Sequence, residues 1–432
     1  MPQILITNGR LIDPANGIDR VSNLLLENGK VAAIDVAEDT SAENIIDAAG
    51  KIVAPGLIDM NVELREPGRE EDETIETGTA AALAGGFTSI ASMPTSDPPV
   101  DTQGSVQYVR TRAREAGNCN VFPLACLSKE RKGEELAEIG LLVEAGAVGF
   151  CDGGRPIRNA ELLRRALEYC RMFEKPVFNR PEIAEISHGG VMHEGLVSLV
   201  LGLSGLPAEA EDMMTARDLR LAESTGGRLH LLNISTAGSV EQLRRSKQRG
   251  ASVTADVSPQ SFTLNDDELR KFDTRYKVKP PLRSSEHLHA LIEGLKDGTI
   301  DVIASSHAPR AAEKKFQDVN AAAFGMVGLE TTLSLVITKL IRPGHLTWTS
   351  ALEKLTINPA RVLGLARRGS LGVGDYADVT IIDPDTTWTV DARQFLSKSE
   401  NTPFDGWDLF GRAETVIVGG KIKFSCVAAM SV

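Results

Sequence analysis

The sequence predicts an α/β protein: a (β/α)8 TIM-like barrel joined to a small β-sandwich domain built from both chain ends. Two observations lead to this fold class. The middle of the chain alternates apolar, strand-like runs with helix-like segments, which is typical of parallel barrels. Both ends carry short strand patterns separated by tight turns. A doubly wound open sheet is the structural alternative, because only the number of strands separates the two folds.

The middle of the chain contains eight strand candidates, of which the run at 176–178 is the shortest. They are residues 56–62, 87–93, 120–125, 146–150, 176–178, 228–232, 252–257 and 301–304. Helical patterns fall between them, for example at 74–84, 160–173, 216–224 and 239–250. Residues 311–325 are charged and then alanine-rich, which predicts a surface loop, and Asn358 begins a last helix.

The two chain ends share one pattern. Strand-like runs at 4–8, 23–27 and 31–35 surround an Asn28-Gly29 hairpin turn, and runs at 378–382, 415–418 and 421–424 surround Gly419-Gly420. We therefore predict that residues 1–54 and 368–432 meet as one composite β-sandwich domain. Residues 55–367 form the barrel.

Composition excludes several classes of function. A net charge of −12 argues against nucleic acid or an anionic membrane as the partner. The longest apolar runs, such as 197–203, are far too short for a membrane span, and no signal peptide is visible, so a cytoplasmic location is predicted. The five cysteines include no C-x-x-C pair, which predicts ordinary buried thiols.

Chemistry in a barrel lies at the carboxyl ends of its strands. In this chain those positions carry mostly amides, hydroxyls and arginines, with His307 as the one histidine. The residues there include Asn61, Glu63, Arg65, Thr95, Asp152, Asn179, Arg180, Asn233, Gln260, Ser306 and Arg310.

Several motifs carry a specific resemblance, which runs from about residue 3 to residue 424. They are VAPGLIDM…LREPG at 53–68, MP-x-x-x-P at 93–98, K-x-x-PPLR at 277–283, SHAP at 306–309, G-x-VGLET at 325–331, NPARVLGL at 358–365 and GDYADVTIID at 374–383. With them the chain resembles the bacterial dihydroorotases of the longer, amidohydrolase-superfamily type. LREPG and PPLR favour that family over the related hydantoinases.

The resemblance implies a metal site whose ligands are absent here. The two metal histidines of the first strand match Asn61 and Glu63, those of strands five and six match Asn179 and Asn233, and the catalytic aspartate matches Ser306. The acidic pair after strand four retains only Asp152.

The family's substrate contacts are changed as well. Thr95 and Lys279 replace asparagines of the family, and Arg310 replaces a histidine. Arg65, which in the family grips the substrate carboxylate, remains.

A bound metal lowers the pKa of water from about 15.7 to about 7, which corresponds to about 12 kcal/mol of nucleophile activation. We therefore predict a pseudoenzyme, with no catalytic, metal or cofactor-binding residues and no cofactor. The resemblance implies a non-catalytic subunit that assembles with and stabilises aspartate carbamoyltransferase catalytic chains in pyrimidine biosynthesis. It would form a homodimer within a larger hetero-oligomer.

Two alternatives stay open. The first is a divergent cyclic-amide hydrolase with a relocated or oxygen-ligated metal site, using Glu63, Asp152 and His307. The second is an anion pocket formed by Arg65, Lys279 and Arg310. Whether the vestigial pocket binds a ligand is undecided; its nine positions are Asn61, Glu63, Arg65, Asp152, Asn179, Asn233, Lys279, Ser306 and Arg310.

The remaining histidines have structural interpretations. His230 lies inside a strand and is expected to be a satisfied core residue, whereas His188 and His193 are expected at the surface. His287 and His289 are expected on a solvated helix face, where positions i and i+2 point apart.

Overall fold

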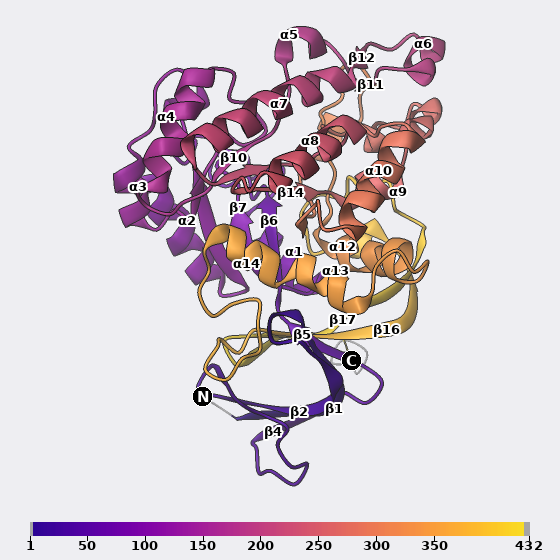
Figure 1. Ribbon diagram of the computed structural model, residues 1–432. Helices are drawn as coiled ribbons and strands as arrows, with labels where there is room; N and C mark the ends of the chain where they lie inside the picture. The colour runs from indigo at the N-terminus through magenta and orange to yellow at the C-terminus, as the bar shows by residue number, and fades with distance from the viewer. Residues whose placement is uncertain (1–2, 427–432) are drawn as a thin grey trace.

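The computed structural model describes residues 3–426 as a barrel with a separate sheet lying beneath it (Figure 1). The barrel is an eight-stranded parallel sheet in the order β15-β14-β13-β10-β9-β8-β7-β6. Its strands are β6 (Leu57–Val62), β7 (Phe87–Ser92), β8 (Asn120–Ala125), β9 (Gly149–Phe150), β10 (Val177–Asn179), β13 (Leu229–Leu231), β14 (Val253–Val257) and β15 (Val302–Ile303). All eight predicted strands are present, so the predicted fold class is confirmed and the open-sheet alternative is wrong.

The barrel closes between its first and last strands. Val62 at the end of β6 forms a parallel bridge with His307, which follows β15, and the Glu63 amide donates a 3.0 Å hydrogen bond to the His307 carbonyl. This contact brings the ends of the first and eighth strands to one point of the rim.

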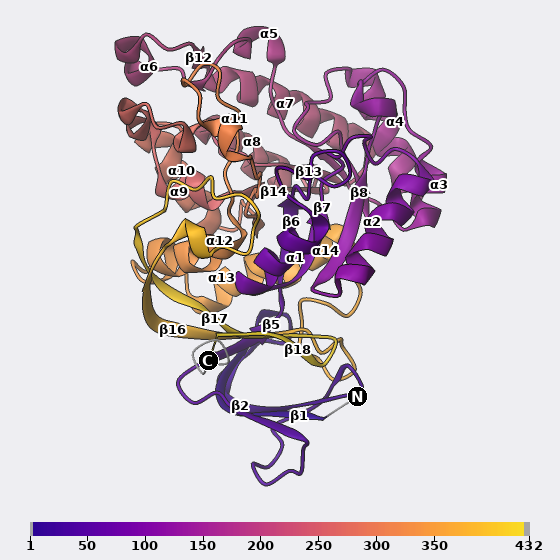
Figure 2. The ribbon, with the colours of Figure 1, turned by 180° about the vertical axis from the view of Figure 1, so that it is seen from behind.

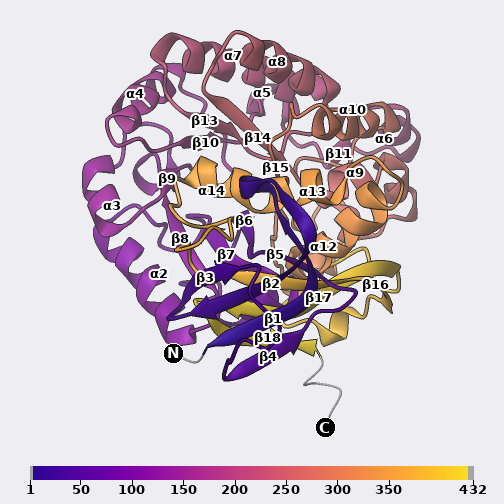
Figure 3. The same cartoon turned by 60° about the horizontal axis from the view of Figure 1, so that its bottom comes forward.

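Helices surround the strands (Figure 3). They include α1 (Ile75–Ala84), α2 (Gln103–Ala116), α3 (Ile139–Ala145), α4 (Ala160–Arg171), α7 (Ala208–Thr225), α8 (Ala237–Gln248), α10 (Ser285–Lys296), α12 (Leu329–Val336), α13 (Trp348–Leu355) and α14 (Ile357–Leu363). The pattern at 216–224 underestimates α7, which begins eight residues earlier at Ala208. Its first turn is acidic and has no apolar periodicity, although Glu209 and Glu211 there suit a helix N-terminus.

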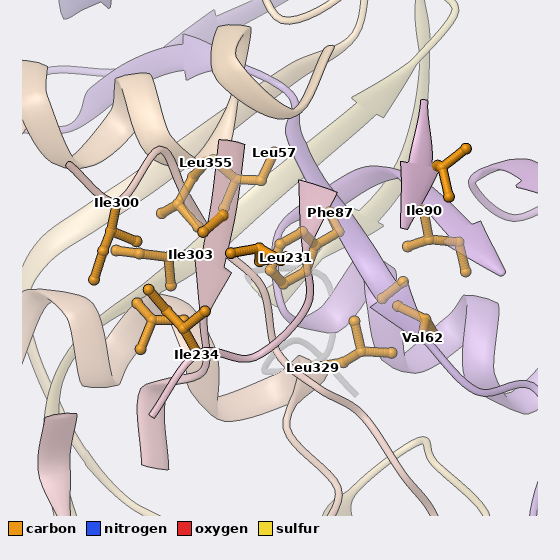
Figure 4. Close-up of a cluster of buried hydrophobic side chains, with 14 of the residues drawn as sticks. Leu57, Val62, Phe87, Ile90, Leu231, Ile234, Ile300, Ile303, Leu329 and Leu355 are labelled. Carbon is orange, nitrogen blue, oxygen red and sulfur yellow. The ribbon is translucent and has the colours of Figure 1, made fainter. Parts of the chain in front are cut away.

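Every residue of β6 is buried, because one face of the strand points into the barrel and the other meets the helices. Leu57 and Val62 belong to the large buried cluster that Figure 4 shows, whereas Ile58 and Met60 belong to a second buried cluster. Burial of each such side chain stabilises the fold by about 1.5–3 kcal/mol. The strand patterns are therefore mostly apolar on both faces, although β6 also contains the buried Asp59 and Asn61.

The second sheet combines strands from both ends of the chain, as Figures 1 and 2 show. It contains β1 (Ile4–Asp13), β2 (Ile18–Glu27), β3 (Lys30–Ile34), β4 (Asn44–Asp47), β5 (Ile52–Pro55), β16 (Val379–Thr389), β17 (Asp408–Val418) and β18 (Lys421–Ser425). The two ends join where β5 pairs antiparallel with β16, for example Val53 with Ile381. The domain boundaries at 54/55 and 367/368 stay predictions, and residues 1–2 and 427–432 of the predicted sandwich lie outside the described part of the chain.

The segment at 311–325 differs from the predicted surface loop. It contains the short helix α11 (Ala312–Lys315), and Lys315 is buried, with its ammonium donating to the carbonyls of Lys277, Ala323 and Gly325. These carbonyls turn inward and need a donor, which the lysine supplies. The segment therefore packs against the barrel mouth.

The described residues contain no helix that is both long enough and apolar enough to cross a bilayer.

Candidate functional site

A cavity of about 260 Å³ opens at the barrel mouth, where the carboxyl ends of the strands converge. Seven of the nine positions of the vestigial pocket line it: Asn61, Glu63, Arg65, Asn233, Lys279, Ser306 and Arg310. Its size suits a small ligand rather than a polymer. We call this cavity the mouth pocket.

The positions that match the family's metal ligands bind one another. The Asn61 amide donates to Asn233 Oδ1 at 3.1 Å, and the Asn233 amide donates to Ser306 Oγ at 2.8 Å. Amide and hydroxyl groups tied together in this way are poor ligands for a catalytic divalent ion, which prefers imidazole and carboxylate. Within residues 3–426 no three or more His, Cys, Asp or Glu side chains are grouped so that they could hold a metal.

The remaining two positions, Asp152 and Asn179, do not line the pocket. Asp152 accepts hydrogen bonds from the amides of Leu127 and Ser128, both at 3.0 Å, and burial raises its pKa. Asn179 accepts from the Ile157 amide and donates to Asp218 at 2.6 Å. Both side chains hold the barrel rim together, so the residues present do not fit a resident metal.

Glu63 is the one carboxylate that lines the mouth pocket in the described chain. Its side chain forms an ion pair with Arg65, whose side chain is 2% exposed. Burial alone would raise the pKa of Glu63, but the positive charges of Arg65, Arg310 and Arg131 outweigh it and lower that pKa. Glu63 is therefore ionised at neutral pH.

Seven cationic side chains surround this single carboxylate: Arg65, Arg69, Arg131, Arg155, Arg180, Lys279 and Arg310. This excess of positive charge is confined to the pocket, because the whole chain has a net charge of −12. Burial lowers the pKa of Arg65 to about 10 and lowers the pKa of Lys279, with Arg180 adding to the latter effect. Clustered cations of this kind attract an anionic ligand.

Two arginines that the sequence did not identify as ligand contacts lie over a pair of glycines. A Cβ on Gly153 would lie 2.9 Å from Arg131 Nη2, and one on Gly154 would lie 3.2 Å from Arg180 Nη1. The two guanidinium groups therefore occupy space that exists only because the loop after β9 has no side chains at these positions. Arg180 directly follows Asn179 at the end of β10, and this position at a strand end was the sequence signal that it could line the pocket. No comparable signal in the sequence identified Arg131.

Some buried polar atoms at this site have no hydrogen-bond partner among the described residues. They are Arg65 Nε, Arg180 Nε and Thr95 Oγ1. Leaving a buried polar group unsatisfied costs about 1–3 kcal/mol. A bound anion would supply acceptors to the two guanidinium groups.

The backbone at the barrel mouth is also unusual. Arg65, Arg131, Asn233 and Ser306 line the pocket and have left-handed conformations, with φ between 50° and 60°. Such conformations cost about 1–3 kcal/mol each and tend to occur at functional sites. They aim these side chains into the mouth pocket.

The histidines have structural roles. His230 is fully buried and bonds Thr254 and Asp256, as expected. His307 lies between the Gly328 amide and Glu73, both at 3.3 Å. The expectation for His193 is wrong, because it is 7% exposed and packs against Arg283 and His287.

Fold and site together define an amidohydrolase-type barrel, and comparisons with known proteins agree. Residues 326–424 match a family model described as "Amidohydrolase family", and residues 50–239 match one described as "Dihydro-orotase-like". The L-hydantoinase of Arthrobacter aurescens superposes with a TM-score of 0.88 at 27% identity, covering 98% of this chain and 96% of that one.

Relatives in sequence are closer. The chain is 49% identical to a dihydroorotase of Pelotomaculum thermopropionicum, over 97% of this chain and 98% of the relative. It is also 49% identical to a putative dihydroorotase of Rhodopirellula baltica, over 97% and 92% of the two chains. The chain therefore belongs to the dihydroorotase family.

These relatives contradict the prediction of a pseudoenzyme that serves as a non-catalytic subunit, because proteins that match nearly the whole chain are named as the enzyme. The sequence argument rested on ligands that are absent; it considered Arg65, Lys279 and Arg310 as an anion pocket but not as part of a catalytic site. The prediction that no residue binds a metal or cofactor stays a prediction.

Proposed function

We propose that the chain binds a carboxylate-bearing cyclic amide of the dihydroorotate type in the mouth pocket and hydrolyses its ring. The names of relatives that share nearly half of its residues support this reaction class. The observation that carries the proposal is the single carboxylate, Glu63, surrounded by cations in that pocket.

The reaction needs a proton acceptor, a water molecule and a group that stabilises negative charge. Glu63 accepts a proton from water as the water oxygen bonds to the ring carbonyl carbon. The oxyanion that forms faces guanidinium groups, of which Arg65 and Arg310 lie near Glu63. Collapse of this tetrahedral intermediate breaks the bond between the carbonyl carbon and the ring nitrogen, and Glu63 returns the proton to that nitrogen.

Of the three groups considered for a relocated site, Glu63 and His307 line the mouth pocket and Asp152 does not. Asp152 bonds the backbone of the neighbouring loop, and both ring nitrogens of His307 lie within hydrogen-bond reach of other groups. A positioned general base contributes about 10²–10⁴-fold and an oxyanion donor about 10²–10³-fold. Because the low pKa of Glu63 makes it a weak base, we expect slow turnover.

The test is hydrolysis of dihydroorotate by chelator-treated protein, followed as disappearance of the cyclic amide. We expect turnover to persist in chelator and the Glu63→Gln variant to lose at least about 100-fold in kcat. Glu185→Gln is the matched control, because Glu185 is an exposed carboxylate paired with Arg158 and does not line the mouth pocket. No turnover above the buffer rate, or turnover that Glu63→Gln leaves unchanged, would refute the proposal.

The partner prediction is carried forward as a separate proposal. We infer from the family resemblance alone that the chain associates with aspartate carbamoyltransferase chains, as a homodimer within a larger assembly. Mass measurement of the two purified proteins together tests it, and elution as separate species counts against it. The cytoplasmic location is likewise a prediction.

A further inference from the structure

Five of the seven cations that line the mouth pocket fall into two groups, and Arg69 and Arg155 belong to neither. Arg65 follows β6 and Arg310 follows β15, which are the two strands that meet where the barrel closes. Arg131 and Arg180 follow β8 and β10, on the opposite part of the rim, with Lys279 beside Arg180. We call these the closure group (Arg65, Arg310) and the far group (Arg131, Arg180, Lys279).

The closure group is partly balanced by carboxylates, because Asp72 beside Arg310 also pairs with Lys314 at 2.9 Å. Arg65 pairs with Glu63, and Arg310 lies 3.8 Å from Asp72. It has room for one further anionic group, since the buried Arg65 Nε has no partner in the described chain.

The far group carries excess positive charge. Glu182 is shared between Lys279 at 2.8 Å and Arg180 at 3.4 Å. Arg131 forms no ion pair within residues 3–426, although its charge contributes to lowering the pKa of Glu63; its Nε donates to the Asp152 carbonyl at 3.0 Å. Arg180 Nε is buried and has no hydrogen-bond partner within the described part of the chain.

The far group is also built into the loop rather than extended from the surface. Gly153 and Gly154 make the space for its two guanidinium groups, and a Cβ on Gly153 would also lie 2.5 Å from Thr95 Cγ2. The amide-hydroxyl chain of Asn61, Asn233 and Ser306 lines the same pocket and adds no charge.

Hydrolysis of a cyclic amide changes the charge of the ligand. One water adds across the carbon–nitrogen bond, the ring nitrogen keeps one proton, and the new carboxylic acid releases the other to solvent. A ring that carries one carboxylate therefore becomes an open-chain dicarboxylate.

We propose that the mouth pocket holds this open-chain dicarboxylate without a metal, with one carboxylate on the closure group and the other on the far group, and prefers it to the cyclic monoanion. The inference rests on the proposed function for the identity of the ligand class. Guanidinium groups match carboxylates with two parallel hydrogen bonds, so the far group replaces a metal as the counter-charge of the second carboxylate.

The experiment is titration calorimetry on chelator-treated, full-length protein with N-carbamoyl-aspartate and with dihydroorotate. The composition of the ligand is analysed after each run, to show that neither compound has been converted into the other during the titration. We expect N-carbamoyl-aspartate to bind at least about tenfold more tightly.

The variants Arg131→Gln and Arg180→Gln are expected to remove this preference by weakening the dicarboxylate at least about tenfold and dihydroorotate less than about threefold. Arg180→Lys keeps the charge and is expected to retain part of the preference. Arg158→Gln is the matched control, because Arg158 is exposed and does not line the pocket. Circular dichroism confirms that each variant is folded.

Equal or tighter binding of dihydroorotate would overturn the inference, as would equal weakening of both ligands in the far-group variants. Failure of the proposed function is a separate result. Binding with the expected preference but without turnover refutes hydrolysis alone, and turnover without the preference refutes this inference alone.

Discussion

Replacing Glu63 by glutamine is expected to separate ligand affinity from turnover. The change removes the one carboxylate among seven cations at the mouth pocket and keeps the shape of the side chain. At an effective dielectric constant of about 20, two like charges about 7 Å apart repel by about 2 kcal/mol. Removing this repulsion should therefore tighten binding of a carboxylate ligand by about 30-fold.

The same change destabilises the protein. Arg65 is 2% exposed and loses its charged partner, and breaking a buried ion pair costs about 3–5 kcal/mol. Because the amide oxygen of glutamine can still accept a hydrogen bond from Arg65, the loss in free energy of unfolding should lie at the lower end of this range, at about 3 kcal/mol.

Calorimetry with N-carbamoyl-aspartate, urea unfolding and kcat for dihydroorotate measure the three effects together. Raising the salt concentration should reduce the gain in affinity, since salt screens the repulsion between the Glu63 carboxylate and the ligand carboxylate in the parent protein. The reasoning fails if Glu63→Gln binds the anion more weakly than the parent, while Glu185→Gln matches the parent throughout.

Three further predictions concern the support of the site and the core. Gly153→Ala should weaken binding of the dicarboxylate in calorimetry, because its Cβ would lie 2.5 Å from Thr95 Cγ2 and displace Arg131; Gly189→Ala, with φ of 73° and nothing nearby, is the control for backbone strain alone. Burial lowers the pKa of Lys315 to about 7, so the unfolded chain binds more protons between about pH 7 and pH 10.5 and this lysine makes the protein more stable as pH rises. Urea unfolding should show a slope of up to about 1.4 kcal/mol per pH unit that Lys315→Met loses, and equal slopes would contradict the assignment. His230→Leu should cost about 1–3 kcal/mol in urea unfolding, because it removes one of the two hydrogen-bond partners of the buried Asp256 and leaves the Asn233 amide as the other, whereas His289→Leu on the exposed face of α10 should change little.

The sequence by itself determined the barrel, because a strand covered on both faces is mostly apolar on both faces. All six residues of β6 are buried, and this local property is visible in Leu57, Ile58 and Met60 before Asn61; the buried Asp59 between them accepts hydrogen bonds from the Asn61 and Ser305 amides. The same logic placed Asn61, Asn233 and Ser306 at one rim, since carboxyl ends of parallel strands meet there. Their hydrogen-bonded chain agrees with that expectation.

Only the tertiary structure decided which side chains face the ligand. Asp152 and Asn179 also stand at strand ends, yet they turn to the backbone of neighbouring loops, whereas Arg131 and Arg180 turn into the mouth pocket over Gly153 and Gly154. The direction of a side chain at the rim depends on the conformation of its loop and on charges contributed by distant strands. No local pattern in the sequence reports either of these. The prediction of an inactive protein followed from the absent histidines. The convergence of cations on Glu63 was not visible in the sequence, because these residues become neighbours only when the barrel closes.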